Sequence, residues 1–477
     1  MNYKMTGYVI GLLLMFQSLF MVIPALTAIV YRESEVWIFL CVAIGCLVIG
    51  KLLTLRKPEN KSLFAREGFV IVAICWIVLS LTGALPFYIS GAIPRFIDAL
   101  FESVSGFTTT GASVVPLIEE LPKCMLMWRS FTHWIGGMGV LVFIMAFLPI
   151  SGAQNMHIMK AESPGPSVSK LVPHVRTTAL WLYGIYFCLT LIEFILLLFG
   201  DMSVFESLNT AFATAGTGGF GIRNDSINSF SAYIQIVVTV FMLLFSLNFT
   251  SYFLMLKGKL KDALTSEIKV FLFVVATAIA VISINTRAQY DSVGDAVRHA
   301  SFSVASLVST TGFATVDFNL WPELSRTILV LVMFMGACAG STGGGIKVSR
   351  LMIFFKNAGN ELHRMLHPKQ VRCISMDSRP VEPSVVRTVS VYMVCYIGIF
   401  AVSSLILSLQ NVDAITNFTA ITATLNNIGP GLESVGPTSN YLFFSDLSKS
   451  VLIFDMLAGR LELFPMLLLF HPSTWKK

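Results

Sequence analysis

Ten apolar runs, each long enough to cross a lipid bilayer, divide this chain of 477 residues. A helix needs about 20 apolar residues to span the hydrocarbon core of a bilayer. Charged residues make up only 13% of the chain, about half the share that soluble proteins carry, so lipid is the expected solvent. The composition predicts an all-α polytopic membrane protein. The runs lie near residues 7–30, 36–56, 68–90, 126–150, 177–200, 231–256, 268–286, 325–354 (interrupted), 386–409 and 447–470.

Four shorter, half-apolar segments lie between the long runs, and each ends in a turn rich in Thr, Gly or Asn. They cover residues 96–108, 203–215, 296–310 and 412–425. Asp98, Ser203, Asp295 and Asp413 open them as expected N-caps. Because this unit recurs four times, we expect four pseudo-symmetric helix–pore loop–helix repeats after two extra N-terminal transmembrane helices. The expected boundaries are 1–60 for the two N-terminal helices and 61–156, 157–260, 261–380 and 381–477 for the repeats.

Segments that enter a membrane without crossing it place irregular backbone at membrane depth. Such backbone is tolerated only where protein buries it or where it lines a water-filled cavity. Four of them indicate one shared pore, with the negative ends of the short helices directed at its axis. Carbonyl oxygens of the turns can then replace the hydration shell of a cation, and glycine lets them approach it. A glycine cap after each short helix is the alternative interpretation, since such caps are common.

The distribution of charge predicts the topology. The connections 51–67, 157–176, 257–269 and 347–387, with both tails, hold 23 of the 33 Lys and Arg but only 8 of the 27 acidic residues. By the positive-inside bias, these loops and both termini are expected to be cytoplasmic. The turns would then face outward, where acidic residues are expected to concentrate cations at the mouth. These residues include Glu102, Glu119, Glu120, Glu206, Asp225, Asp317 and Glu433.

Three further expectations follow from charged residues. Arg129 and His133, near the start of the fourth run, are expected at the outer interface. The basic stretch 347–387 reflects topology alone, or it is a docking surface for a cytoplasmic partner. The residues that favour docking are His363, His367, Lys369 and Arg372. The turns themselves contain no carboxylate, which favours a monovalent cation over Ca²⁺.

The four turns and two later segments carry a family resemblance. The turns are Thr-Thr-Gly111-Ala, Thr-Gly-Gly219-Phe, Thr-Thr-Gly312-Phe and Asn-Asn-Ile-Gly429-Pro. The later segments are Gly340-Ser-Thr-Gly-Gly-Gly-Ile-Lys347 and Gly459-Arg460-Leu-Glu-Leu-Phe-Pro465. Together they resemble the TrkH/TrkG potassium uptake proteins, which are related to KtrB and to the plant HKT transporters. The resemblance covers the whole chain, and the two extra N-terminal spans are similar to TrkH rather than to the shorter KtrB.

The resemblance implies K⁺ uptake across the bacterial inner membrane through a carbonyl selectivity filter. The filter residues it implies are Thr110, Gly111, Gly218, Gly219, Thr311, Gly312, Ile428 and Gly429. In HKT proteins a serine in place of the first filter glycine is associated with Na⁺ permeation. Here all four positions are glycine, which favours K⁺: Gly111, Gly219, Gly312 and Gly429. An additional glycine, Gly216, leaves the register of the second turn open between Gly216 and Gly219.

The resemblance also implies partners. It implies a homodimer with one pore per subunit, and a cytoplasmic TrkA-type ring that binds nucleotides and opens the pore. No organic cofactor and no nucleic-acid partner is expected.

The eighth run is interrupted by residues 336–345, where three consecutive glycines each disfavour helix by about 1 kcal/mol relative to alanine. The interruption is a kink or a close packing contact, or, as the family favours, a flexible gate across the pore. The gate would consist of Gly340, Ser341, Thr342, Gly343, Gly344 and Gly345. Lys347 and Arg350, just beyond it, are expected to couple it to the cytoplasmic partner.

Arg460 lies in the last apolar run, where a charge is costly and usually functional. It pairs with Asp455 or Glu462, or, as the resemblance implies, it faces the pore below the filter and limits the flow of cations.

The chain is not expected to be an enzyme, because it shows no nucleophile–base set and no cluster of metal ligands. A symporter that couples K⁺ to H⁺ or Na⁺ is one alternative, supported only by the intramembrane acids Glu193, Asp455 and Glu462. A membrane scaffold or receptor without transport is another, but it would leave the four turns unexplained. The eight cysteines are expected to be apolar helix residues without disulfides.

Overall fold

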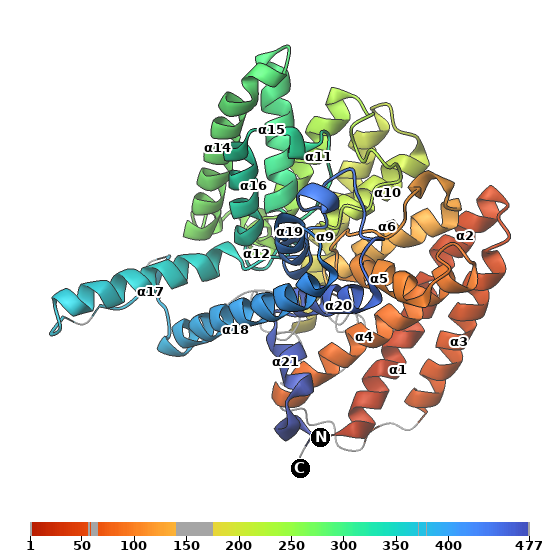
Figure 1. The fold of residues 1–477 in the computed structure, drawn as a ribbon. Coiled ribbons are helices and arrows are strands. Elements are labelled where there is room, and N and C mark those ends of the chain that lie inside the picture. The colour runs from red at the N-terminus through yellow and green to blue at the C-terminus, as the bar shows by residue number, and fades with distance from the viewer. Residues whose placement is uncertain are drawn as a thin grey trace.

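The structure, a computed structural model, describes residues 2–55, 58, 65–139, 175–370, 372–377 and 379–475. These residues form a helical membrane protein in which long helices surround a group of short ones (Figure 1). Six of the described helices are long and apolar enough to span a bilayer, and a bent pair raises the number to seven. The described part also contains a short antiparallel hairpin of β1 (Ser375–Met376) and β2 (Arg379–Pro380).

The first apolar run forms α1 (Tyr3–Phe20) and α2 (Val22–Tyr31), and the second forms α3 (Val36–Thr54). Two glycines let α1 and α3 cross closely. A Cβ at Gly11 would lie 2.7 Å from the carbonyl oxygen of Gly50, and a Cβ at Gly50 would lie 2.6 Å from that of Gly11. These helices are the pair that the sequence places before the repeats.

Four repeats follow, each with a long helix, a short helix, a turn and a second helix. The first contains α4 (Ala65–Ile89), α5 (Phe96–Phe107) and α6 (Lys123–Gly137). The second contains α9 (Val175–Leu198), α10 (Val204–Ala215), α11 (Ala232–Phe245) and α12 (Phe249–Leu256). The third contains α13 (Leu260–Ala263), α14 (Ser266–Thr286), α15 (Val293–Val308), α16 (Glu323–Met335) and α17 (Val348–Leu366). The fourth contains α18 (Pro383–Leu407), α19 (Ala414–Leu425), α20 (Asp446–Arg460) and α21 (Phe464–Phe470).

Part of the predicted organisation lies outside the described residues. This applies to residues 140–150 of the fourth apolar run and to residues 157–174 of the second basic connection. The expected repeat boundaries at 60/61 and 156/157 also fall there.

Among the described residues, the second helix is broken in three repeats, although the sequence predicts a break only in the third. In the second repeat, α11 and α12 meet at 91°, and the side chain of Asn248 caps α12 by accepting the N–H of Thr250 at 2.8 Å. In the fourth, α20 and α21 are separated where Glu462 and Leu463 adopt positive φ, just before Pro465. Local caps and a proline therefore override an unbroken apolar pattern.

The N-cap expectation is correct for two of the four short helices. Ser203 caps α10 in a capping box with Glu206, and Asp413 caps α19. Asp295 lies inside α15, which is capped by Ser292. Asp98 lies inside α5, which begins at Phe96, so its carboxylate is free for a different role.

Asp98 forms a buried ion pair with Lys449 of α20, with 2.5 Å between Oδ1 and Nζ. The exposed fractions of the two side chains are 4% and 0%. Since Asp98 belongs to the first repeat and Lys449 to the fourth, the pair ties the last repeat to the first and closes the arrangement. Such a pair is costly to bury, but removing one partner is costlier still.

We predict that Lys449→Met destabilises the protein by about 3 kcal/mol or more, because among the described residues Asp98 then keeps only Arg95, at 4.0 Å, as a cationic neighbour. The double variant Asp98→Asn/Lys449→Met removes both charges and should recover much of the loss. Unfolding midpoints in detergent measure both effects. Equal midpoints for the single and the double variant would contradict the pairing.

Candidate functional site

The short helices α5, α10, α15 and α19 all end in the same backbone turn. The cap residue of each keeps a helical φ, and these residues are Thr108, Gly216, Ser309 and Asn426. The next residue is left-handed, with φ between 53° and 61°, at Thr109, Thr217, Thr310 and Asn427. Two residues further on, φ is positive again, between 75° and 95°, at Gly111, Gly219, Gly312 and Gly429.

Hydrogen bonds hold each left-handed residue in place. The N–H of Thr110 donates to the carbonyl of Ser105 at 2.9 Å, and the equivalent bonds in the other turns measure 2.8–2.9 Å. The N–H of Thr109 donates to the carbonyl of Gly106 at 3.1 Å, and its equivalents measure 2.8–3.2 Å. This pair of bonds is the Schellman motif, whose left-handed position usually carries glycine. Threonine there costs of order 1–3 kcal/mol, so three of the turns store strain.

The shared geometry answers the question of register in the second turn. Gly216 occupies the helical cap position, with φ of −69°, whereas Gly219 occupies the positive-φ position of the other three glycines. Gly219 is therefore the structural equivalent of Gly111, and Gly216 is the equivalent of Thr108.

The four glycines form a closed ring, each against a carbonyl of the next turn. A Cβ at Gly111 would lie 1.9 Å from the carbonyl oxygen of Gly218, and one at Gly219 would lie 2.0 Å from that of Thr311. A Cβ at Gly312 would lie 2.0 Å from the carbonyl oxygen of Ile428. A Cβ at Gly429 would lie 2.7 Å from that of Thr110. Any side chain at these positions would force the turns apart.

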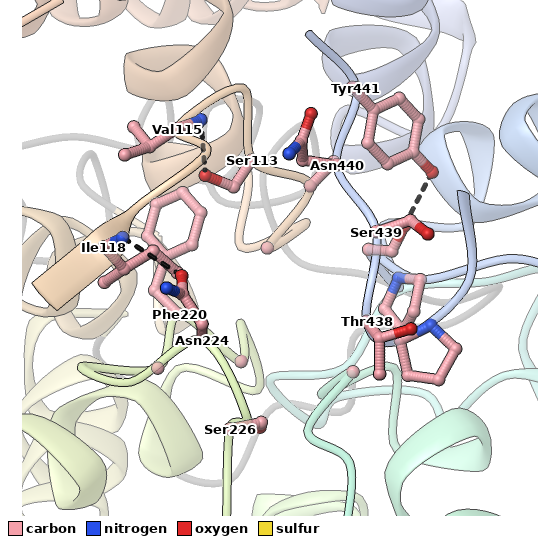
Figure 2. A pocket seen from close by; sticks show the side chains of 18 of the residues that line it. Ser113, Val115, Ile118, Phe220, Asn224, Ser226, Thr438, Ser439, Asn440 and Tyr441 are labelled. Atoms are coloured by element: carbon pink, nitrogen blue, oxygen red, sulfur yellow. Dashed lines mark hydrogen bonds between the residues drawn. The ribbon is translucent and has the colours of Figure 1, made fainter. Parts of the chain in front are cut away.

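The ring forms the floor of a cavity of about 210 Å³ that all four glycines line. Figure 2 shows Ser113, Phe220 and Tyr441 around this cavity, contributed by three different segments of the chain. The turns of the four repeats thus meet at one place, beside one cavity that they all line.

A buried cation supports the first two turns from behind. Arg129 of α6 pairs with Glu102 of α5 at 2.7 Å, and both side chains are at most 1% exposed. Arg129 also donates to the carbonyl of Gly221 at 3.2 Å, and Glu102 accepts the hydroxyl of Ser113 at 3.0 Å. The expectation that Arg129 lies at the outer interface is wrong, because its charge is matched inside the protein.

His133 was expected at the same interface and is also buried, with 0% exposure. Its Nδ1–H donates to the carbonyl of Gly106 at 2.7 Å, and its Nε2 accepts the N–H of Phe220 at 3.2 Å. A Cβ at Gly218 would lie 2.3 Å from this ring. The second turn therefore carries glycine where the first and third carry threonine.

The interruption after α16 forms a loop, residues 336–347, that packs directly against the turns of the third and fourth repeats. The N–H of Gly344 donates to the hydroxyl of Thr310 at 2.6 Å. A Cβ at Gly343 would lie 2.8 Å from the carbonyl oxygen of Ser309, and one at Gly344 would lie 2.4 Å from that of Asn426. The glycines thus allow the loop to lie in close contact with both turns.

The same loop rests on the bend between α11 and α12. The N–H of Cys338 donates to the carbonyl of Ser246 at 3.0 Å, and the hydroxyl of Thr342 donates to that of Phe245 at 3.1 Å. The N–H of Phe249 donates to the carbonyl of Gly340 at 3.0 Å. The loop is therefore held by backbone contacts from a different repeat.

A comparison with known proteins assigns the chain to a family. The profile of the TrkH family, described as "Cation transport protein", matches residues 37–477. The chain belongs to the TrkH family. It is 36% identical over the full length of both proteins to "Trk system potassium uptake protein TrkH" of Escherichia coli K12. It is 31% identical to "Trk system potassium uptake protein TrkG" of the same organism, with 99% of each chain covered.

A solved structure of a relative supports the same assignment. The crystal structure of "the Potassium Transporter TrkH from Vibrio parahaemolyticus" matches with a TM-score of 0.89 at 33% identity, covering 100% of both chains. The family is a family of membrane transport proteins and not of enzymes.

Lys347 and Arg350, expected to couple the loop to a cytoplasmic partner, are buried, with 2% and 5% exposure. The ammonium group of Lys347 donates to the carbonyl of Gly343, within the same loop. Arg350 pairs with Glu462, in the break between α20 and α21. Arg350 therefore joins the start of α17 to the fourth repeat, whereas Lys347 bonds within the loop.

Arg460 joins the loop to the first repeat. Its guanidinium donates to the carbonyl of Thr342 at 2.8 Å and to those of Gly136 and Gly137 at 2.5 and 2.6 Å. Its two candidate acidic partners are engaged elsewhere, Glu462 with Arg350 and Asp455 with the hydroxyl of Ser403 at 2.9 Å. These bonds place the positive charge of Arg460 against three backbone carbonyls, one of which belongs to the loop.

Several acidic residues expected at the mouth are matched by arginines. Glu102 is buried with Arg129, Glu206 pairs with Arg223 at 2.7 Å, and Glu433 pairs with Arg326. The negative charge around the opening is therefore smaller than the sequence suggests.

Three other acidic or thiol groups meet near the N-terminus of α6. The ligand atoms of Glu33, Glu35 and Cys124 lie within 4.8 Å of one another. Glu33, however, already accepts the N–H groups of Lys123 and Cys124 at 2.6 and 2.9 Å. We therefore interpret this cluster as a helix cap.

We predict that Gly219→Ala destabilises the protein by about 1–3 kcal/mol, because its methyl group would overlap the carbonyl of Thr311. Gly184→Ala is the matched control, since Gly184 lies in α9 and a Cβ there would meet nothing within 4 Å. It should be neutral or slightly stabilising. Melting temperatures of the purified variants measure the difference, and equal effects would contradict the tight ring.

Proposed function

We propose that this protein takes up K⁺ across the bacterial inner membrane through a pore whose selectivity depends on the carbonyl oxygens of the four turns. The observation that carries the proposal is the closed ring, in which each glycine lies against a carbonyl of the next turn. The names of the relatives, Trk system potassium uptake proteins, support K⁺ as the ion.

The arrangement of charge supports a monovalent cation. The turns that follow the four short helices meet in one ring, so the C-terminal ends of these helices, which carry partial negative charge, lie near one region. Carbonyl groups replace water around an ion without the full charges that a divalent ion favours. The proposed filter consists of Thr110, Gly111, Gly218, Gly219, Thr311, Gly312, Ile428 and Gly429.

The loop after α16 is the proposed gate. It comprises Gly340, Ser341, Thr342, Gly343, Gly344 and Gly345, with Lys347 at its end. Contacts with Thr310 on one side and with Arg460 on the other support this role. The loop lies between two helices, so it can move aside without unfolding a helix once its hydrogen bonds to the neighbouring repeats are released.

A partner would act on this loop through α17. Figure 1 shows α17 extending away from the helical bundle, and it continues directly from the loop. Apolar side chains on α17 are exposed, including Phe355 at 68% and Met365 at 76%. We propose that this helix and the basic residues around it face the cytoplasm and contact a second subunit or a TrkA-type nucleotide-binding ring.

An alternative function, coupling of K⁺ to H⁺ or Na⁺, is supported by buried acids in the membrane. Glu193 and Asp455 are both 0% exposed. Asp455 accepts the hydroxyl of Ser403, and Glu193 lies in α9, a helix that packs against the short helix α10. Carboxyl groups of this kind serve as proton sites in coupled transporters.

We predict that the purified protein, reconstituted in liposomes, passes labelled Rb⁺ and that excess K⁺ competes more strongly than excess Na⁺. Flux should persist when no H⁺ or Na⁺ gradient is present. Flux that requires one of these gradients would favour the symporter. A complete lack of flux, even with the nucleotide-binding partner added, would favour a scaffold or receptor.

We predict that shortening residues 340–345 raises K⁺ flux in the absence of a partner. A subtler variant, Thr310→Val, keeps the shape of the side chain but removes the acceptor for the N–H of Gly344. It should raise partner-independent flux by roughly threefold to tenfold, the effect of one lost hydrogen bond on the closed state. Thr277→Val, in α14 and exposed, is the matched control. Unchanged flux in both folded gate variants would contradict the gate.

A further inference from the structure

Tyr441 contacts the proposed filter in the fourth repeat. Its hydroxyl donates to the carbonyl oxygen of Gly429 at 2.7 Å. Its backbone N–H donates to the carbonyl of Ser113 in the first repeat at 2.8 Å. One buried residue, 3% exposed, therefore spans the junction between the last turn and the first.

The ring of Tyr441 is fixed by its neighbours. It packs against Phe101 of α5 with 5.7 Å between ring centroids and against Phe444 with 5.8 Å. Its position beside the cavity over the glycines is visible in Figure 2. A hydroxyl on a ring held from two sides is a rigid donor, so the carbonyl of Gly429 is rigidly held as well.

This contact makes the fourth turn different from the others. Within the described residues, the carbonyls of Gly111, Gly219 and Gly312 accept no such side-chain bond. The ring of four glycine turns is also less tight at this junction. A Cβ at Gly429 would lie 2.7 Å from the nearest carbonyl oxygen, whereas the distance is 1.9–2.0 Å at the other three glycines. The loosest junction is therefore the one that carries an added hydrogen bond.

We propose that Tyr441 is a specificity-determining positioning residue, which keeps the Gly429 carbonyl from closing inward around an ion smaller than K⁺. This inference rests on the proposed function, in which the ring selects the ion. A carbonyl oxygen has two lone pairs, so the bond from Tyr441 leaves one for an ion while it restricts movement of the group. Closure around Na⁺ requires inward movement of the carbonyls. At the loosest junction, Tyr441 opposes that movement.

The test is Tyr441→Phe in the full-length protein, reconstituted in liposomes and measured by uptake of labelled Rb⁺ in competition with K⁺ and with Na⁺. The Phe variant keeps the ring and its packing but loses the hydroxyl. We expect Rb⁺ flux to persist and the preference for K⁺ over Na⁺ to fall roughly threefold to tenfold, the range for one hydrogen bond. A selectivity ratio does not depend on the amount of folded protein, so a purely structural role would leave it unchanged.

Tyr233→Phe is the matched control, because Tyr233 also donates its hydroxyl to a backbone carbonyl, that of Leu196, at 3.0 Å and away from the filter. If Tyr441→Phe does not fold, 3-fluorotyrosine at position 441 provides a second variant. Its stronger donor should keep or raise the preference for K⁺, and a lower preference would overturn the inference.

The outcomes separate this inference from the proposed function. Wild-type protein that passes no Rb⁺, with or without its partner, overturns the proposed function. Wild-type protein that conducts, together with an unchanged selectivity ratio in Tyr441→Phe, overturns the role of Tyr441 alone.

Discussion

The close approach of each glycine to a carbonyl of the next turn is the constraint on which the site depends. The approach exists because all four short helices end in the same motif, with a left-handed residue and a positive-φ glycine two positions later. Three of the left-handed residues are threonines, which adopt this conformation only at a cost. Contacts with the surrounding structure offset this conformational free energy, and these contacts differ from one junction to the next.

These contacts explain why the repeats are alike in backbone but not in side chains. Between the first and second turns the supports are Arg129 and His133. Beneath the third, the support is the loop, which contacts Thr310. Between the fourth and first turns they are Tyr441 and the Lys449–Asp98 pair. A ring of four similar backbone turns is thus held in place by a different set of contacts at each junction.

Much of the architecture could be predicted from the sequence, because apolar length and repeated turns are local signals. The turn glycines and the broken third repeat have such signals. The burial of Arg129, His133 and Arg350 could not be predicted, since it depends on partners distant in the sequence. Tyr441 was missed for the same reason: nothing near it marks a contact with Gly429. The register of the second turn could be assigned only from the backbone angles at Gly216 and Gly219, because a glycine fits a helical cap as well as a positive-φ position.

The central claim is that the ring of turns binds the ion. The most direct measurement is a crystal structure of the protein crystallised in a rubidium salt, with anomalous scattering used to locate the Rb⁺ ions. We predict anomalous peaks on the axis of the ring, between the carbonyl oxygens of Thr110, Gly218, Thr311 and Ile428. A fully ordered ring without Rb⁺, with ions bound elsewhere in the membrane region, would contradict the account.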